Sequence, residues 1–205
     1  MLGLNKYLAQ QFAKPSGKWG KYITFLMNMM NQKQYQSILE LLNPQPTDSI
    51  LDIGFWNGFL LWKILNTSLQ QLYGIEISED MLHLAQDKYK QAIAMEKLSL
   101  TLADIQKLPF SNEHFDKIYT VNTFYFRKNI EQSFSEIRKV LKPQWQFFNV
   151  IYTKEWLDKL PSVTKYNFWK HSLEDIIKYT EESRLHVINC KEIVPKKSYC
   201  VIASK

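Results

Sequence analysis

From residue 49 onward, short apolar runs alternate with longer segments in which apolar residues recur at helical spacing. The apolar runs predict seven strands, over residues 49–53, 71–77, 98–103, 116–121, 145–152, 185–194 and 198–204. The amphipathic segments predict four helices between them, over residues 58–65, 78–95, 130–141 and 173–180. This alternation is typical of a parallel sheet with helices on both faces.

The last two predicted strands, 185–194 and 198–204, are joined only by the turn Pro195-Lys196-Lys197. No helix separates them, so they must pair antiparallel. The predicted fold class is therefore α/β: a three-layer, doubly wound, Rossmann-like sheet of seven mostly parallel strands with an antiparallel C-terminal hairpin. The purely parallel nicotinamide-binding fold lacks this ending.

The first 46 residues follow a different pattern. Residues 22–42 have apolar side chains at roughly helical spacing, and prolines at positions 44 and 46 end the segment. A loop-like stretch with one proline and two glycines, 14–20, precedes it. We predict an N-terminal helical cap over residues 1–46 and a ligand-binding domain over residues 47–205.

Composition narrows the class of protein. The chain has 205 residues, of which 45% are hydrophobic and 22% charged, as in a globular domain with a real core. The net charge is +6, but the lysines are scattered and no basic cluster contains aromatic residues, so nucleic-acid binding is disfavoured. We expect no transmembrane segment, because no run approaches about 20 apolar residues. Without a signal-peptide pattern, and with only Cys190 and Cys200 as cysteines, the expected location is cytoplasmic and no metal motif is present.

Candidate chemistry gathers where the predicted strands end, because ligands of open α/β sheets bind outside the carboxyl ends of the strands. After the first strand the chain reads Asp52-Ile53-Gly54-Phe55-Trp56-Asn57-Gly58. Glycines there let the backbone approach a ligand, and the following helix offers free N–H donors. Taken alone, Gly54 and Gly58 are equally consistent with a tight turn and no ligand.

Two more strand ends carry acidic residues. Glu76, followed by Ile77, ends the second strand and is placed to accept hydrogen bonds from ribose hydroxyls. Asp104, followed by Ile105, comes after the third strand, where a carboxylate can accept from an adenine amino group while the isoleucine covers the ring. Each carboxylate taken alone is also consistent with a solvated strand end or a turn. Together, in this order, the three segments indicate a site for one adenosyl ligand.

These segments resemble class I S-adenosylmethionine-dependent methyltransferases, in particular the ubiquinone/menaquinone-biosynthesis type (methyltransferase domain type 11). The likeness spans roughly residues 35–145, and the antiparallel C-terminal hairpin agrees with it. The motifs that carry the resemblance are Leu51-Asp52-Ile53-Gly54…Gly58, Gly74-Ile75-Glu76-Ile77-Ser78…Met81-Leu82 and Ala103-Asp104…Leu108-Pro109-Phe110…Phe115-Asp116-Lys117-Ile118.

The resemblance implies an enzyme that moves a methyl group from S-adenosylmethionine to a small-molecule acceptor and leaves S-adenosylhomocysteine. Transfer from a sulfonium is an in-line displacement, so positioning is expected to supply most of the rate, about 7–11 kcal/mol in well-oriented systems. The implied cofactor-binding residues are, for the methionine end, Asp52, Gly54, Phe55, Trp56 and Gly58; for the ribose, Glu76 and Ile77; for the adenine, Asp104 and Ile105; and beside the sulfonium, Asn122 and Thr123.

Two positions depart from the family pattern. Trp56 stands where the family usually has glycine, so its indole must either turn away from the ligand or narrow the site. A non-catalytic protein that keeps the fold to bind a ligand or a partner therefore stays open. A nicotinamide dehydrogenase is disfavoured, because Trp56 and Phe59 fill two glycine positions of Gly-x-Gly-x-x-Gly. In the turn before the fifth strand, Gln144-Trp145 replace a frequent Gly-Gly.

A general base is needed only if the acceptor must lose a proton. Tyr125, just past the fourth strand, is the predicted catalytic residue, and Tyr7 is the alternative if the N-terminal segment folds over the site. Aromatic side chains outside the strands favour an aromatic or lipophilic acceptor, although they are equally consistent with packing of the cap. They are Trp19, Tyr152, Trp156, Tyr166, Phe168 and Trp169.

Overall fold

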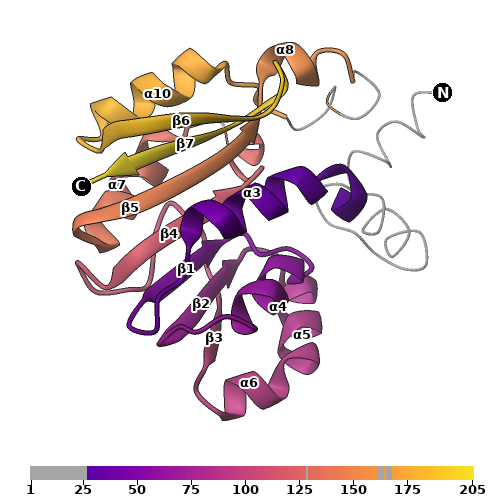
Figure 1. The fold of residues 1–205 in the computed structure, drawn as a ribbon, viewed down its shortest axis with the longest axis vertical. Helices are drawn as coiled ribbons and strands as arrows, with labels where there is room; N and C mark the ends of the chain where they lie inside the picture. Colours follow the sequence, from indigo (N-terminus) through magenta and orange to yellow (C-terminus); the bar gives the residue numbers. More distant parts are fainter. Residues whose placement is uncertain (1–26, 128, 161–163, 165–167) are drawn as a thin grey trace.

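The computed structural model describes residues 27–127, 129–160, 164 and 168–205. Within these residues the chain forms one seven-stranded sheet with the order β3-β2-β1-β4-β5-β7-β6 (Figure 1). The strands are β1 (Ser49–Ile53), β2 (Gln71–Glu76), β3 (Leu98–Leu102), β4 (Phe115–Val121), β5 (Leu141–Tyr152), β6 (His186–Val194) and β7 (Ser198–Ser204).

The pairing confirms the predicted fold class. Strands β1 to β5 pair in parallel. Strand β7 is antiparallel to both of its neighbours, β5 and β6, and it lies between them. The short turn between β6 and β7 forces this reversal, because parallel neighbours would need a long crossover connection.

Helices cover both faces of the sheet, which gives the predicted three layers (Figure 1). Side chains alternate along each strand, so Leu51 packs into the core beneath α7 and α10 while Ile50 packs into the core beneath α3 and α4. The helical elements are α3 (Gln32–Leu42), α4 (Phe59–Leu65), α5 (Glu79–Lys88), α6 (Lys90–Ala94), η1 (Phe124–Phe126), α7 (Glu131–Val140), α8 (Lys154–Leu157) and α10 (Leu173–Glu182).

Two predicted boundaries were wrong. The single helix predicted over 78–95 is divided into α5 and α6 at Tyr89, whose hydroxyl donates to the carbonyl of Gly58 at 2.7 Å. The fifth strand begins at Leu141, four residues before the predicted start, because Leu141 already pairs with Phe115 of β4; the register then shifts over the stretch that contains Pro143. Gln144 lies in this irregular stretch with φ 68°, a left-handed conformation that favours glycine.

Helix α3 is part of the core. Tyr35, Ile38 and Leu42 are buried with residues of β1 and α4. Residues 1–26 lie outside the described part of the chain, so the division into a cap over 1–46 and a domain over 47–205 stays a prediction.

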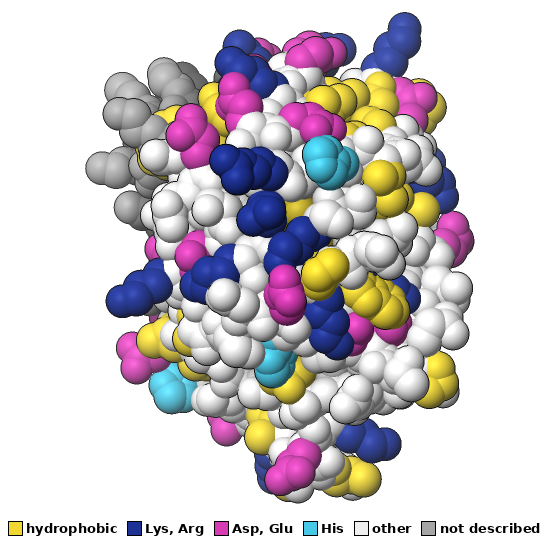
Figure 2. Space-filling model, turned by 90° about the vertical axis from the view of Figure 1, so that its left-hand side faces the viewer, with side chains coloured by type: hydrophobic (Ala, Val, Ile, Leu, Met, Phe, Trp, Pro, Cys, Tyr) yellow, Lys and Arg dark blue, Asp and Glu magenta, His cyan; other side chains and the backbone are white. Residues whose placement is uncertain are grey.

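On the face drawn in Figure 2, lysine and arginine side chains lie among acidic, apolar and neutral ones. Within the described residues, the structure contains no helix with the length and apolar character needed to span a bilayer.

Candidate functional site

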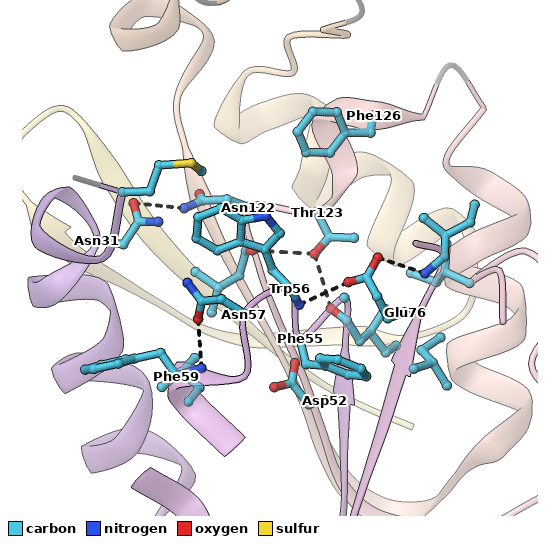
Figure 3. Close-up of a pocket in the computed structure, with 18 of the residues that line it drawn as sticks. Asn31, Asp52, Phe55, Trp56, Asn57, Phe59, Glu76, Asn122, Thr123 and Phe126 are labelled. Atoms are coloured by element: carbon cyan, nitrogen blue, oxygen red, sulfur yellow. Dashed lines mark hydrogen bonds between the residues drawn. The ribbon is translucent and has the colours of Figure 1, made fainter. Parts of the chain in front are cut away.

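A cavity of about 280 Å³ lies where the loops after β1, β2, β3 and β4 meet the start of α3 (Figure 3). Nine of the residues predicted to bind the cofactor line it: Asp52, Gly54, Phe55, Trp56, Glu76, Ile77, Ile105, Asn122 and Thr123. Gly58, Asp104 and Tyr125 lie outside its wall. The topology explains this convergence, because all four strands are parallel and their carboxyl ends share one edge of the sheet.

Both glycines of the first turn are structurally required, for different reasons. Gly54 has φ 76°, its N–H donates to Ile75 at 2.8 Å, and a Cβ would lie 2.9 Å from Oγ1 of Thr123 in the cavity wall. Gly58 has φ 69°, and a Cβ there would lie 2.8 Å from the ring of Tyr89. Gly54 therefore keeps the cavity wall bare, whereas Gly58 allows the turn to pack on Tyr89.

Glu76 is held by the backbone. Its Oε1 accepts from the N–H groups of Ile77 at 2.8 Å and Ser78 at 2.9 Å, and its Oε2 accepts from the N–H of Trp56 at 3.0 Å. Burial raises the pKa of Glu76, while these N–H groups and the charge of Arg127 act in the opposite direction. Of about four acceptor positions on a carboxylate, these bonds use three and leave one for a ligand hydroxyl.

The same bonds lie at the start of α5. Ser78 occupies the N-cap position. Its hydroxyl, however, is buried and makes no hydrogen bond within the described structure. The Glu76 carboxylate accepts the N–H of Ser78 and the N–H before it.

Asp52 is a buried carboxyl group in the cavity wall. Only 3% of the residue is exposed, and the hydroxyl of Tyr119 donates to its Oδ2. Burial raises the pKa of Asp52 to about 8, the hydrogen bond from Tyr119 lowers it, and the charge of Glu76 raises it further. A cationic ligand group beside this carboxyl would favour its ionised form.

Trp56 narrows the cavity. Its backbone has φ 49°, in the left-handed region, and its N–H is fixed by Glu76. Figure 3 shows the indole ring in the middle of the residues that line the cavity. The indole Nε1 is buried and has no hydrogen-bond partner among the described residues. Of the two outcomes expected from the sequence, the structure has the ring in the cavity.

The opposite wall is built from amide and hydroxyl side chains. Asn122 has φ 58° and its Nδ2 donates to Gln34 at 2.7 Å and, less closely, to Asn31 at 3.4 Å. The Nδ2 of Asn31 donates in turn to the hydroxyl of Tyr35 at 3.4 Å. Asn31, Tyr35 and Asn122 all line the cavity, so α3 contributes directly to the site.

Asp104 is engaged by a side chain outside the predicted set. Its Oδ2 lies 2.9 Å from Nη1 of Arg127, and its Oδ1 accepts from the N–H of Gln106 at 2.9 Å. Its neighbours Ala103 and Ile105 line the cavity, and so does Arg127. The carboxylate therefore lies at the rim of the cavity.

Tyr125 is buried behind the cavity wall. Its hydroxyl is hydrogen-bonded to Asn122 Oδ1 at 3.1 Å and to both the carbonyl and the N–H of Tyr152. Burial raises its pKa well above the ordinary value. These contacts suit a residue that positions Asn122, and the proton-transfer role of Tyr125 stays a prediction.

A family model described as a methyltransferase domain matches residues 51–148, the stretch that supplies Asp52, Glu76 and Asn122 to the cavity. Over this stretch, just under half of the chain, the sequence resembles class I S-adenosylmethionine-dependent methyltransferases. An uncharacterized methyltransferase of Bacillus subtilis (strain 168), YdaC, is 28% identical over 182 residues, which are 88% of this chain and 96% of YdaC. The cofactor of this methyltransferase family is S-adenosylmethionine.

Other similar proteins agree. A crystal structure of a SAM-dependent methyltransferase from Aquifex aeolicus has a TM-score of 0.72 at 20% identity, covers 89% of this chain and 96% of its own, and shows the same fold. An O-methyltransferase of Pyrenophora dematioidea is 27% identical over 120 residues, 58% of this chain. This chain spans less than half of that relative, 45% of its length.

The chemistry of the lining residues is compatible with this cofactor. Gly54 leaves a bare backbone turn that a Cβ would fill, Glu76 keeps an acceptor position, and Asp52 presents a carboxyl group beside which an ammonium would be favourable. The indole of Trp56 reduces the space for a ligand. Within the described residues, no group of three or more His, Cys, Asp and Glu side chains is placed to hold a metal ion.

Several lining residues were missed by the sequence interpretation: Met27, Asn31, Tyr35, Asn57, Phe59, Phe126 and Arg127. One signal was present, because Asn31 and Tyr35 are four residues apart and therefore share a face of the predicted helix. Of the aromatic residues expected at the acceptor site, the described ones, Tyr152, Trp156, Phe168 and Trp169, are outside the wall of this cavity. Tyr7, Trp19 and Tyr166 lie outside the described residues, so the expectation for them stays a prediction.

Proposed function

We propose that this methyltransferase transfers the methyl group of S-adenosylmethionine to a small, uncharged acceptor with an aromatic or lipophilic body. The observation that carries the proposal is the convergence of Gly54, Glu76 and Ile105 on one cavity whose remaining wall includes residues of α3 and η1. In this proposal, the residues that converge bind the two ends of an adenosyl ligand, and the remaining wall provides a separate surface for an acceptor.

The acceptor class follows from the chemistry of the remaining wall. Met27, Tyr35 and Phe126 supply apolar and aromatic surface, and Asn31 and Asn122 supply neutral hydrogen-bonding groups. Among the described lining residues the one cationic side chain, Arg127, is already paired with Asp104. An uncharged acceptor with one polar group therefore matches this wall better than a phosphate or a carboxylate does.

In this proposal each residue holds a part of the cofactor, which supplies an already activated methyl group. Asp52 and the Gly54 turn hold the methionine end, and Glu76 holds the ribose. Asn122 and Thr123 lie beside the sulfonium and direct the acceptor. The chain then accelerates the reaction mainly by alignment, since no described lining residue is a histidine poised to take a proton.

A second function, ligand binding without catalysis, is motivated by one observation. The indole of Trp56 lies inside the cavity with its Nε1 buried and unpaired. A protein that acts only as a sensor would bind the cofactor or its product in this cavity but transfer no methyl group.

Calorimetry with S-adenosylmethionine and S-adenosylhomocysteine tests cofactor binding. Glu76→Gln should weaken binding by about 100-fold, because the charged acceptor of a ribose hydroxyl becomes an amide. Glu113→Gln is the control, since the Glu113 side chain is half-exposed and outside the cavity wall. Equal affinities of the two variants would remove the site assignment.

Turnover tests catalysis separately. We expect formation of S-adenosylhomocysteine with at least one member of a panel of phenols, quinols and prenylated aromatic compounds. Tight cofactor binding without product across the panel would favour the sensor. No binding of either cofactor form by the folded protein would contradict both functions.

A further inference from the structure

An ion pair joins two loops that begin far apart in the sheet. Asp104 follows the end of β3, and Arg127 follows η1 after β4. Strands β2 and β1 lie between β3 and β4, which places the two strands about 14 Å apart at the usual strand spacing. The 2.9 Å contact between Arg127 and Asp104 therefore requires both loops to reach across the intervening strands.

The guanidinium belongs to the cavity. Arg127 lines it together with Ala103 and Ile105, the two neighbours of Asp104. The side chain of Arg127 is 18% exposed, and its positive charge offsets part of the rise that burial causes in the pKa of Glu76. Arg127 is thus placed among the groups that we assign to the adenine and the ribose.

The pair has unused hydrogen-bonding capacity on both sides. Each oxygen of Asp104 accepts one contact, from Gln106 or from Arg127, and a carboxylate oxygen has about two acceptor positions. Arg127 has five N–H donors in a plane, and within the described part of the chain its guanidinium forms this single ion pair. Acceptor and donor positions therefore lie side by side at the rim of the cavity.

The amino edge of adenine has the complementary pattern, an N–H donor beside a ring nitrogen that accepts. We infer that Arg127 is a specificity-determining residue of this methyltransferase: Asp104 accepts from the adenine amino group while Arg127, held by Asp104, donates to the adjacent ring nitrogen. The inference rests on the proposed function, because it requires an adenosyl ligand in the cavity.

In the opposite role, Arg127 blocks the site: its guanidinium occupies the position of the adenine and must move away before the cofactor binds. The two roles predict effects of opposite sign. If Arg127 donates to the adenine, its removal weakens cofactor binding. If Arg127 blocks the site, its removal tightens cofactor binding.

The experiment is calorimetry with S-adenosylhomocysteine and with its 1-deaza and 7-deaza analogues, each of which lacks one ring nitrogen beside the amino group. We expect wild type to bind one analogue about tenfold more weakly than the parent compound. Arg127→Met should bind the parent compound about tenfold more weakly and should no longer distinguish that analogue. Arg127→Lys keeps the charge but not the planar donors, so it should also lose most of the discrimination.

Lys205→Met is the matched control, because it removes another ion pair of 2.9 Å, with Glu113, outside the cavity wall. Urea unfolding of each variant checks that it is folded. If Arg127→Met is not folded, the test uses Arg127→Lys. Two results would overturn the inference but not the proposed function. One is that the Arg127 variants bind S-adenosylhomocysteine as tightly as wild type or more tightly. The other is that each deaza analogue loses the same affinity, relative to the parent compound, in wild type and in variant. No binding of S-adenosylhomocysteine by folded wild type would overturn the proposed function and the inference with it.

Discussion

The two walls of the cavity hold their polar groups by different means. On the strand side, the turns after β1 and β2 fix Glu76 through three backbone N–H groups and fix Gly54 through a backbone bond to Ile75. On the helix side, Asn31 and Asn122 are held mainly by other amide and hydroxyl side chains.

This difference indicates which wall can be altered by single substitutions. A backbone turn is fixed by the fold and suits a ligand part that is always the same, such as the adenosyl cofactor. A network of side chains is altered by single substitutions and suits a part that differs between enzymes, such as the acceptor. We therefore expect substitutions in the strand-side wall to act on cofactor affinity and those in the helix-side wall to act on acceptor turnover.

The largest effect is expected for Gly54→Ala. The added Cβ would lie 2.9 Å from Thr123 Oγ1 at a φ of 76°, so the turn must move or the cavity must fill. We predict a loss of affinity for S-adenosylhomocysteine of at least about 100-fold, measured by calorimetry, with a loss of stability of about 1–2 kcal/mol.

Gly58→Ala is its matched control. It carries the same kind of strain at φ 69°, but its Cβ would meet Tyr89 and not the cavity. It should lose similar stability and change affinity by less than about threefold. Equal losses of affinity in both variants would mean that the stability of the turn governs binding, and not the absence of a side chain at Gly54.

The second largest effect concerns Asp52 and pH. Burial raises its pKa from 3.8 to about 8, so between these values the folded protein keeps a proton that the unfolded chain has released. The contribution of this group to the free energy of unfolding therefore falls as pH rises through that window. Urea unfolding of wild type and Asp52→Asn should show wild type losing stability relative to the variant from acid to about pH 8. A difference between them that is constant with pH would contradict the raised pKa.

A smaller effect is expected on the helix-side wall. Asn31→Ala removes an amide that faces the cavity and bonds to Tyr35 and Asn122. We predict a loss of about tenfold in kcat/KM for the acceptor and an unchanged affinity for S-adenosylhomocysteine. Gln36→Ala, an exposed glutamine on the same helix, should change neither quantity. Weaker cofactor binding by Asn31→Ala would place the cofactor against both walls.

The strand-side wall was predictable from the sequence, whereas in the helix-side wall Asn122 was predicted and the residues from α3 were not. Glu76 and the Gly54 turn follow directly from strand ends that local hydrophobic patterns reveal, since parallel strands bring their carboxyl ends to one edge. The spacing of Asn31 and Tyr35 indicates that they share a helix face, but they reach the site because α3 packs on β5 and β6. That packing is a tertiary contact between residues distant in the chain, so the local pattern does not indicate where this face lies.

Arg127 and Trp56 illustrate the same limit in the loops. The pairing of Arg127 with Asp104 spans two intervening strands, and neither residue type nor spacing predicts it. For Trp56, the sequence marked the departure from glycine but left both orientations of the ring open. The left-handed backbone at φ 49° and the bond to Glu76 accompany the orientation observed.

The smallest effect is expected where Trp56 extends the strand-side wall into the cavity. Trp56→Gly removes the ring and suits the left-handed backbone, so affinity for S-adenosylhomocysteine should rise by about threefold, as measured by calorimetry. Trp56→Phe keeps a ring but removes the buried, unpaired Nε1–H and should bind within about twofold of wild type. Weaker binding by Trp56→Gly would mean that the indole contacts the cofactor. The wall that holds the cofactor would then depend on a side chain as well as on backbone, and the contrast between the two walls would be one of degree.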